Sequence, residues 1–178
     1  MKNDNQAYQY DKSETDLKSR HYWDLVRKCG QRYKSFDWLS VRLFLNFIYT
    51  YDMLSRQFAR IHVKNLGLSS ASFNILMILS RNKTSGCKQR EISKLMLVSR
   101  ADITGLVDQL AKRGLAERLA DQNDRRVWIV KITKKGESLL EAYLPGHYKE
   151  IRDLMVSFSR KDKAAFSLFL EKLRSTLK

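Results

Sequence analysis

The stretch REISKLMLVSRADITGLVDQLAKRGLAERLADQNDRRVWIVKITKKG, Arg90–Gly136, changes its hydrophobic period part-way along. As far as Leu110 its apolar residues recur every three or four positions, which is the spacing of one helix face. Further on, Trp128, Val130 and Ile132 fall on one face of an extended chain. The stretch therefore predicts short helices followed by a two-stranded ribbon.

The second of these helices carries its own start and stop signals. Ser99 stands three positions before Asp102, a pair that is typical of a helix N-cap. A helix is therefore predicted from Arg100 to about Arg113, and Gly114 would end it. The two strands are predicted at Leu115–Ala120 and Arg126–Ile132.

Helices are also predicted on both sides of this stretch. The strongest pattern runs from Asp37 to Lys64, and Gly67 would close that helix. A short helix is predicted after a capping signal at Ser13 and Asp16, ending near Cys29 and Gly30. The others are predicted from Ser69 or Ser70 to near Asn82, at Gln89–Met96, from Thr133 to about Phe158 with a bend at Pro145, and after a Ser159 cap. Seven glycines and one proline offer little turn chemistry for an all-β fold. We expect a mainly α fold with a small β-hairpin.

Composition narrows the class of protein and of partner. The chain has 178 residues, of which 43% are hydrophobic, and this suits one domain, with or without an appendage, that has a real core. The formal net charge is +15 and favours an anionic partner such as DNA, RNA or an acidic membrane surface. Residues 88–135 carry 12 Lys plus Arg against 6 Asp plus Glu, a net charge of +6. This central part is the most basic of the chain.

Helix, turn, capped helix and ribbon, in this order, describe a winged helix-turn-helix. In such proteins the second helix enters the major groove of DNA with its N-terminus first. Once the apolar residues are assigned to the core, the candidates that face the groove are Arg100, Ala101, Thr104, Gly105 and Asp108, with Ser99 at the cap. Arg100 would read a guanine edge, and Lys88 and Gln89 would contact the DNA backbone. A solvated helix face is the alternative for each of them.

The predicted tip of the ribbon brings acids and arginines together. Long arginines on a mobile tip lose entropy when they are fixed, and a neighbouring carboxylate can orient a guanidinium by accepting one of its hydrogen bonds. We therefore interpret Asp124 as an aligner, with Arg125 and Arg126 as the groups that reach phosphates or the minor groove. Read alone, the tip favours a solvated turn with surface ion pairs, and it is the preceding helix-turn-helix that favours the DNA-contacting interpretation.

The same stretch resembles the MarR family of bacterial transcriptional regulators. The resemblance rests on GLVDQLAKRGLAER at Gly105–Arg118, on the wing residues Asp121, Asp124 and Arg126, and on ITKKG at Ile132–Gly136. It implies an N-terminal extension at 1–35, a dimerisation helix at 36–68, a winged helix-turn-helix at 69–135 and C-terminal dimerisation helices at 136–178. Gly105 departs from the family, which often has a larger residue there. It could let the helix approach DNA closely, or the position could tolerate change.

The resemblance also implies an activity. We expect a homodimer that binds a pseudo-palindromic double-stranded DNA operator, more often as a repressor, and that releases DNA when a small phenolic or anionic ligand binds. The candidates for that ligand pocket are Tyr49, Tyr51, Arg56 and His62. Core packing for the tyrosines and solvent exposure for Arg56 are the simpler interpretations. A regulator that needs no ligand and an architectural nucleic-acid-binding protein stay open as alternatives.

Sensing through a thiol or a metal is a weaker expectation. Cys29 follows Arg27 and Lys28, whose charges would favour a reactive thiolate, so a redox sensor is conceivable there. Cys87, just before the helix-turn-helix, reads as structural. The three histidines are dispersed without ligand spacing, so we expect no metal site and no cofactor.

Other classes of function find less support. The chain contains neither a glycine-rich phosphate loop nor a nucleophile elbow, so we do not expect an enzyme. A secretory signal and a membrane-spanning run are not apparent either, and we expect a protein of the bacterial cytoplasm that associates with the nucleoid when it binds DNA.

Overall fold

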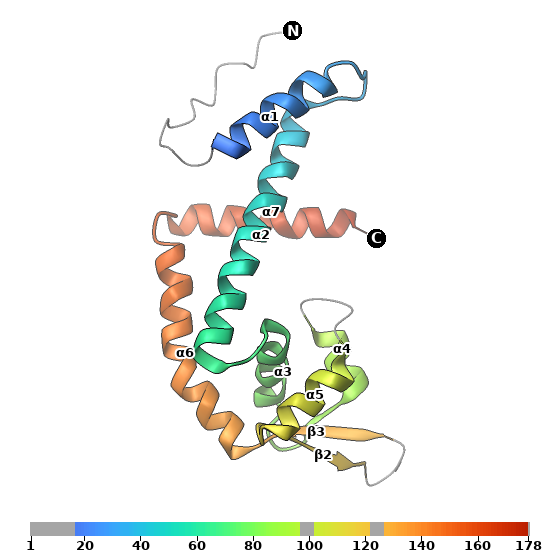
Figure 1. Ribbon diagram of the computed structural model, residues 1–178, viewed down its shortest axis with the longest axis vertical. Coiled ribbons are helices and arrows are strands. Elements are labelled where there is room, and N and C mark those ends of the chain that lie inside the picture. The colour runs from blue at the N-terminus through green and yellow to red at the C-terminus, as the bar shows by residue number, and fades with distance from the viewer. Residues whose placement is uncertain (1–16, 97–101, 122–126, 178) are drawn as a thin grey trace. The chain divides into compact units, whose positions relative to one another are not determined.

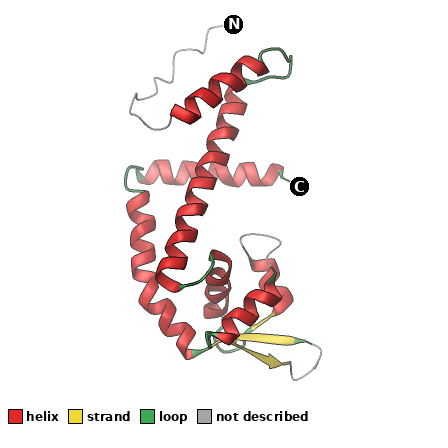
Figure 2. Cartoon of the chain, viewed as in Figure 1, coloured by secondary structure: helices red, strands yellow, loops and turns green. Residues whose placement is uncertain are grey.

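The computed structural model describes residues 17–96, 102–121 and 127–177, and these form helices with one small sheet (Figure 2). The chain divides into two compact units, Met1–Arg56 and Gln57–Lys178. Within the described residues, no helix is both long enough and apolar enough to cross a membrane.

The first unit contains α1, Leu17–Gly30, and the first part of α2, Trp38–Leu66 (Figure 1). The Asp37 carboxylate accepts hydrogen bonds from the Leu39 and Ser40 N–H groups at 3.2 and 3.1 Å and so satisfies donors at the start of α2. The Ser40 hydroxyl also donates to this carboxylate, and this bond, together with the two backbone bonds, lowers the pKa of Asp37. The Arg42 guanidinium lies 5.9 Å from the ring centre of Trp23, so a cation–π contact joins α1 to α2.

The second unit holds the remaining elements. They are α3 Ser70–Arg81, β1 Cys87–Lys88, α4 Gln89–Leu95, α5 Ile103–Lys112, β2 Ala116–Ala120, β3 Trp128–Ile132, α6 Lys134–Leu154 and α7 Arg160–Thr176. The three strands form an antiparallel sheet in the order β1-β3-β2. Val130, in the central strand, pairs with Cys87 on one side and with Arg118 on the other.

Helix caps account for several of these boundaries and confirm the predicted ones. The Ser69 side chain accepts from Ser72 N at the start of α3, and Ser159 forms a capping box with Asp162 at the start of α7. Gly67 has the left-handed φ of 62° that ends α2, as the sequence predicts. Pro145 lies inside α6, which continues through it and bends along its length (Figure 1).

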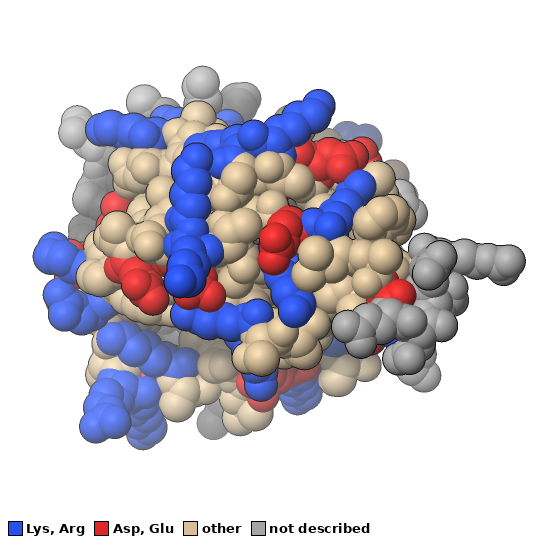
Figure 3. Space-filling model, turned by 90° about the horizontal axis from the view of Figure 1, so that it is seen from below, with Lys and Arg blue, Asp and Glu red and all other residues tan. Residues whose placement is uncertain are grey.

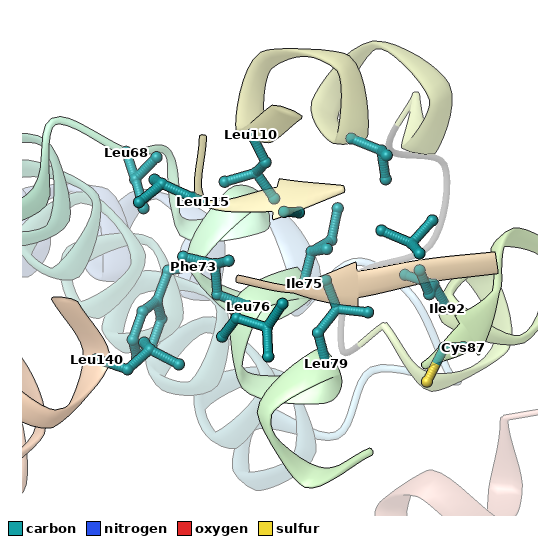
Figure 4. Packing of buried hydrophobic residues seen from close by; sticks show 14 of the residues in the cluster. Leu68, Phe73, Ile75, Leu76, Leu79, Cys87, Ile92, Leu110, Leu115 and Leu140 are labelled. Carbon is teal, nitrogen blue, oxygen red and sulfur yellow. The ribbon is translucent and has the colours of Figure 1, made fainter. Parts of the chain in front are cut away.

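The core lies between α3, α5 and the sheet (Figure 4). Ile75, Leu76 and Leu79 of α3 have no exposed surface, and they meet Val107 and Leu110 of α5. Val130 and Ile132 of β3 close the cluster, whereas Trp128, predicted on the same face of this strand, is 48% exposed and lies outside it. Because α5 contributes fully buried side chains, the position of this helix is fixed by the core.

Two predictions about local structure were wrong. Strand β1 was not predicted, because it is only two residues long and depends on pairing with β3 rather than on a hydrophobic pattern of its own. Helix α5 begins at Ile103 and not at Arg100, because Asp102 has non-helical backbone angles and its own side chain caps the helix.

Candidate functional site

The start of α5 is organised by Asp102. Its carboxylate accepts a hydrogen bond from Gly105 N at 3.1 Å. A Cβ atom added to Gly105 would lie 2.4 Å from Asp102 Oδ2, so the glycine makes room for the cap. Gly105, the third residue of α5, therefore has a local structural role that neither interpretation from the sequence included. The candidate DNA contacts Ser99, Arg100 and Ala101 lie outside the described residues.

Gln89 and Thr104, both predicted to contact DNA, are brought together. The Gln89 side-chain amide donates to the Thr104 hydroxyl at 2.6 Å, and both residues lie near the start of their helices. This hydrogen bond joins α4 to α5, the two helices of the helix-turn-helix. Thr104 is exposed on α5.

Arg118 of β2 holds α5 from the sheet side. Its Nη1 atom lies 2.7 Å from Asp108 Oδ1 in an ion pair, and its Nη2 atom donates to Thr104 O at 3.1 Å. The Arg118 Nε atom is buried and has no hydrogen-bond partner among the described residues. A guanidinium that bridges two points of one helix fixes both its position and its rotation. Asp108, a predicted groove residue, is thus engaged in the helix support.

The base of the wing is fixed by a buried carboxylate. Asp121 is only 6% exposed, and its Oδ2 atom lies 3.1 Å from Lys88 Nζ. Asp121 N also donates to Val127 O at 2.9 Å, which closes the ribbon beyond β2 and β3. Lys88, predicted to contact the DNA backbone, therefore ties β1 to the wing. The predicted tip residues Asp124, Arg125 and Arg126 lie outside the described residues.

The part of the second unit that carries α5, β2 and β3 forms its lower end in Figure 1. Seen from below, Lys and Arg side chains spread over much of this face, with fewer Asp and Glu side chains among them (Figure 3). Such a surface attracts a polyanion. Exposed cations near α5 include Arg90, Lys94 and Lys112.

A buried aromatic and histidine cluster lies away from this surface, where α2, α3 and α6 meet. His62 stacks on Phe73 with ring centres 4.4 Å apart, and His147 lies 5.6 Å from His62. Tyr143 stacks on His147 with ring centres 5.4 Å apart, and Phe58 contacts His147 edge-on with ring centres 5.8 Å apart. His62 was a predicted pocket residue, whereas nothing in the sequence pattern paired it with His147, because 85 residues separate them.

Burial governs the titration of this cluster. His62 is 5% exposed and His147 9%. Burial lowers the pKa of His62, and the nearby His147 lowers it further. Burial also lowers the pKa of His147, an effect that Glu150 partly opposes. His62 Nδ1 and Ser70 Oγ lie 2.8 Å apart, whereas His62 Nε2 and Glu150 Oε2 are buried without a hydrogen-bond partner among the described residues. The lowered pKa values favour the neutral form of both imidazoles.

A hollow of about 390 Å³ adjoins this cluster. Its apolar lining comes from Phe73, Met77 and Ile78 of α3 together with Leu95 of α4. The polar lining residues are Asn74, Arg81, Asn82 and His147. Apolar walls with a few polar groups and one cation suit a small, partly apolar anion.

The other predicted ligand-pocket residues have different surroundings. Tyr49 and Tyr51 are exposed on α2, and Arg56 forms an ion pair with Asp52 one turn earlier. Cys29 is exposed at the end of α1. Cys87 is buried at the start of β1 and burial raises its pKa, as expected of a structural thiol. Within residues 17–96, 102–121 and 127–177, no group of three potential metal ligands comes together.

Comparisons with known proteins agree with this arrangement. A family model described as MarR family matches residues 66–127. The HTH-type transcriptional repressor YetL of Bacillus subtilis is 30% identical over 151 residues, which cover 85% of this chain and 90% of YetL. Sco3205, a MarR family transcriptional regulator from Streptomyces coelicolor solved in complex with DNA, matches 82% of this chain and 92% of its own with a TM-score of 0.75 at 16% identity. The MepR–DNA complex of S. aureus matches 74% of this chain and 96% of its own, with a TM-score of 0.64 at 19% identity.

Replacing Arg118 by Ala should weaken DNA binding about tenfold. The substitution removes the ion pair to Asp108 and the hydrogen bond to Thr104 O, so α5 loses its support from β2. Bonds to a charged group contribute about 1–3 kcal/mol, and a loss of this size in binding free energy corresponds to roughly a tenfold weaker affinity or more. Fluorescence anisotropy with a labelled genomic duplex, after a circular dichroism melt has confirmed folding, measures the change.

Asp108→Ala provides the matched test of charge against position. It makes the chain more positive, so simple attraction to DNA would tighten binding, whereas loss of the Arg118 pair should weaken it. Tighter binding by Asp108→Ala at low salt would contradict a supporting role for this ion pair.

Stability should depend on pH through the two buried histidines. Their pKa values are lowered in the folded protein, so the unfolded chain takes up protons first as the pH falls. The free energy of unfolding should therefore be highest above about pH 6.5, the ordinary histidine value, and should fall as the pH drops from there toward the lowered folded values. Urea denaturation at about pH 7.5 and 5.5 measures the difference. The double variant His62→Phe/His147→Phe keeps aromatic rings in place, and an unchanged difference in it would locate the pH dependence elsewhere.

Proposed function

Because the chain belongs to the MarR family, we propose that it is a homodimeric transcriptional regulator that binds a pseudo-palindromic site in double-stranded DNA and represses transcription. The support of α5 by Gln89, Arg118 and Asp108 carries this proposal. Because these contacts already fix the position of α5, the helix can place its exposed side in a major groove without first being ordered by DNA. The relative YetL is named a repressor, which favours repression over activation.

Apolar side chains left exposed support the homodimer. Leu39, Leu43 and Phe44 of α2 are each at least 61% exposed. No residue of α7 is buried, and Phe166 and Phe169 are 53% and 65% exposed. Large exposed apolar patches mark interaction surfaces in soluble proteins. We assign them to a second copy of this chain because a two-fold DNA site needs two recognition helices related by the same symmetry.

The surface around α5 supports DNA over other anionic partners. A regulator of this kind reads half-sites in successive major grooves, about 34–36 Å apart. The basic face seen in Figure 3 would contact phosphates on both sides of each groove. An architectural protein would use the same charge without preference for sequence, and it is the alternative that a footprint separates from a regulator.

Release of DNA by a small phenolic or anionic compound completes the proposed function. The hollow lined by Met77, Ile78 and Arg81 favours such a ligand, because its walls are apolar and its cation can pair with a carboxylate. It lies beside α3 and α6, so a ligand there could change how α3 packs under the DNA-binding elements. Such a ligand acts only if it binds one conformation of the dimer more tightly than the other.

Substituting Phe166 by Glu should convert the dimer to a monomer and abolish the footprint. Phe166 is already 53% exposed, so the change should not disturb the fold of a single chain. Ser175→Glu is the matched control. It adds the same charge to α7, but on the opposite face of the helix from Phe166. Light scattering should give about twice 20.9 kDa for the wild type and the control. DNase footprinting on co-purified genomic fragments should show a protected pseudo-palindrome for both, and uniform protection without a preferred site would refute a sequence-specific regulator.

A phenolic carboxylate should release the protein from that footprinted site through Arg81. With 4-hydroxybenzoate as the probe, we expect the apparent affinity for the site to fall with ligand concentration in the wild type. Arg81→Ala should shift the required concentration upward by about tenfold or more, because the paired cation is lost. Lys64→Ala, which removes an exposed cation from α2, should respond like the wild type. An identical response of Arg81→Ala would place the ligand elsewhere.

A further inference from the structure

We propose that Arg113 is a positioning residue that ties the recognition helix to the end of α2 and thereby sets the spacing between the two recognition helices of the dimer. This inference rests on the proposed function, because it concerns the regulator acting as a dimer on two half-sites. It assigns a role to a side chain that does not need to contact DNA.

Arg113 joins two helix ends that are far apart in the sequence. It is the C-cap residue of α5, directly after Lys112. Its Nη1 atom donates to Gly67 O at 2.6 Å and its Nη2 atom donates to Leu66 O at 2.9 Å. These carbonyls stand at the C-terminus of α2, where the last carbonyl groups of a helix have no partner within it.

Charge and shape both favour this contact. The C-terminus of a 29-residue helix carries a partial negative charge, which a cation stabilises. A guanidinium presents its donors in a planar fork, so two parallel bonds fix its direction as well as its distance. Gly67 takes the left-handed backbone that turns the chain at this point, and a Cβ added there would lie 3.5 Å from both Arg113 Nη atoms. The turn at Gly67 and the side chain of Arg113 therefore fit each other.

The same end of α5 is also fastened to the start of α6. Lys135 Nζ donates to Arg113 O at 2.9 Å, and the Thr133 hydroxyl donates to Gly114 O at 2.7 Å. The C-terminus of α2, the C-terminus of α5 and the N-terminus of α6 thus meet at Arg113. Helix α6 leads on to α7, whose exposed apolar side chains are assigned to the second copy, so this junction links α5 to that face.

The hydrogen bonds of Arg113 restrict the orientation of α5, which apolar packing alone does not. Leu66 of α2 and Leu110 of α5 are buried in the same core cluster. Apolar contacts are not directional, however, so they allow α5 to tilt more readily than two charged hydrogen bonds do. In a two-fold dimer any tilt occurs in both subunits. The separation of the two recognition helices, and with it the accepted half-site spacing, should therefore become less well defined when Arg113 is replaced.

Arg113 is poorly placed to act by reading bases. It lies ten residues beyond Ile103, which is roughly 15 Å along the helix from the end that enters the groove. Its guanidinium is engaged with Leu66 O and Gly67 O on the side of α2. Substitution should consequently alter the spacing between half-sites and leave the sequence of each half-site unchanged.

In vitro selection from a random double-stranded DNA library tests this, because the selected duplexes themselves reveal the half-site and its spacing. The full-length wild type, Arg113→Lys, Arg113→Met and the control Lys112→Gln are each carried through selection. Arg113→Lys keeps the charge but cannot form the two-pronged contact. Lys112→Gln removes one cation at the neighbouring exposed position. Light scattering and a circular dichroism melt are recorded first, and whichever Arg113 variant melts like the wild type is used.

We expect the wild type and Lys112→Gln to enrich one half-site sequence at a single spacing. The Arg113 variants should enrich the same half-site at several spacings, with affinity for the wild-type spacing reduced about tenfold. If the wild type enriches a paired motif and an Arg113 variant enriches it at the same single spacing with unchanged affinity, the role given to Arg113 is wrong. If the wild type enriches no paired motif at all, the proposed function itself fails, and this result is distinct from the first.

Discussion

The position of α5 depends on contacts from its neighbours, because a helix of ten residues is too short to be stable in water by itself. Val107 and Leu110 bury one side of it in the core, and this sets its distance from the sheet. Its rotation and tilt depend instead on charged hydrogen bonds. Arg118 holds the first half of the helix through Asp108 and Thr104 O, and Arg113 holds its end. The exposed side of α5 is therefore positioned by two arginines, Arg118 and Arg113.

Much of the fold could be predicted because the deciding signals are local. Helix periodicity, the caps at Ser69 and Ser159 and the stop at Gly67 each depend on a few adjacent residues, and the structure confirms them. The start of α5 was mispredicted because Ser99 and Asp102 are both good N-cap residues, and spacing alone cannot choose between them. Gly105 leaves room for the Asp102 carboxylate at this cap. A single glycine makes no recognisable pattern in the sequence, so this preference for Asp102 was not visible there.

Less of the candidate site could be predicted, because its important pairs are distant in the chain. His62 and His147 carry no spacing signal, and only the packing of α2 against α6 puts their rings 5.6 Å apart. Asp121 belongs to the motif that carries the resemblance, but its burial against Lys88 depends on a strand that has no hydrophobic pattern. Two charged residues predicted to face DNA proved to be engaged in ion pairs. Within the described residues, Lys88 pairs with Asp121 at the base of the wing, and Asp108 pairs with Arg118 of β2.

The histidine cluster and the contacts of Arg113 both involve the last turns of α2. His62 lies one turn before Leu66, whose carbonyl accepts from Arg113, so the buried cluster and the arginine tie share the last turns of α2. A change at the cluster, whether protonation or a ligand in the adjoining hollow, would act on the helix end that Arg113 grips. Because closely packed interiors transmit small displacements, such a change need not reach DNA directly. A small change in the direction of the Leu66 and Gly67 carbonyl groups, which accept from the Arg113 guanidinium, would be enough.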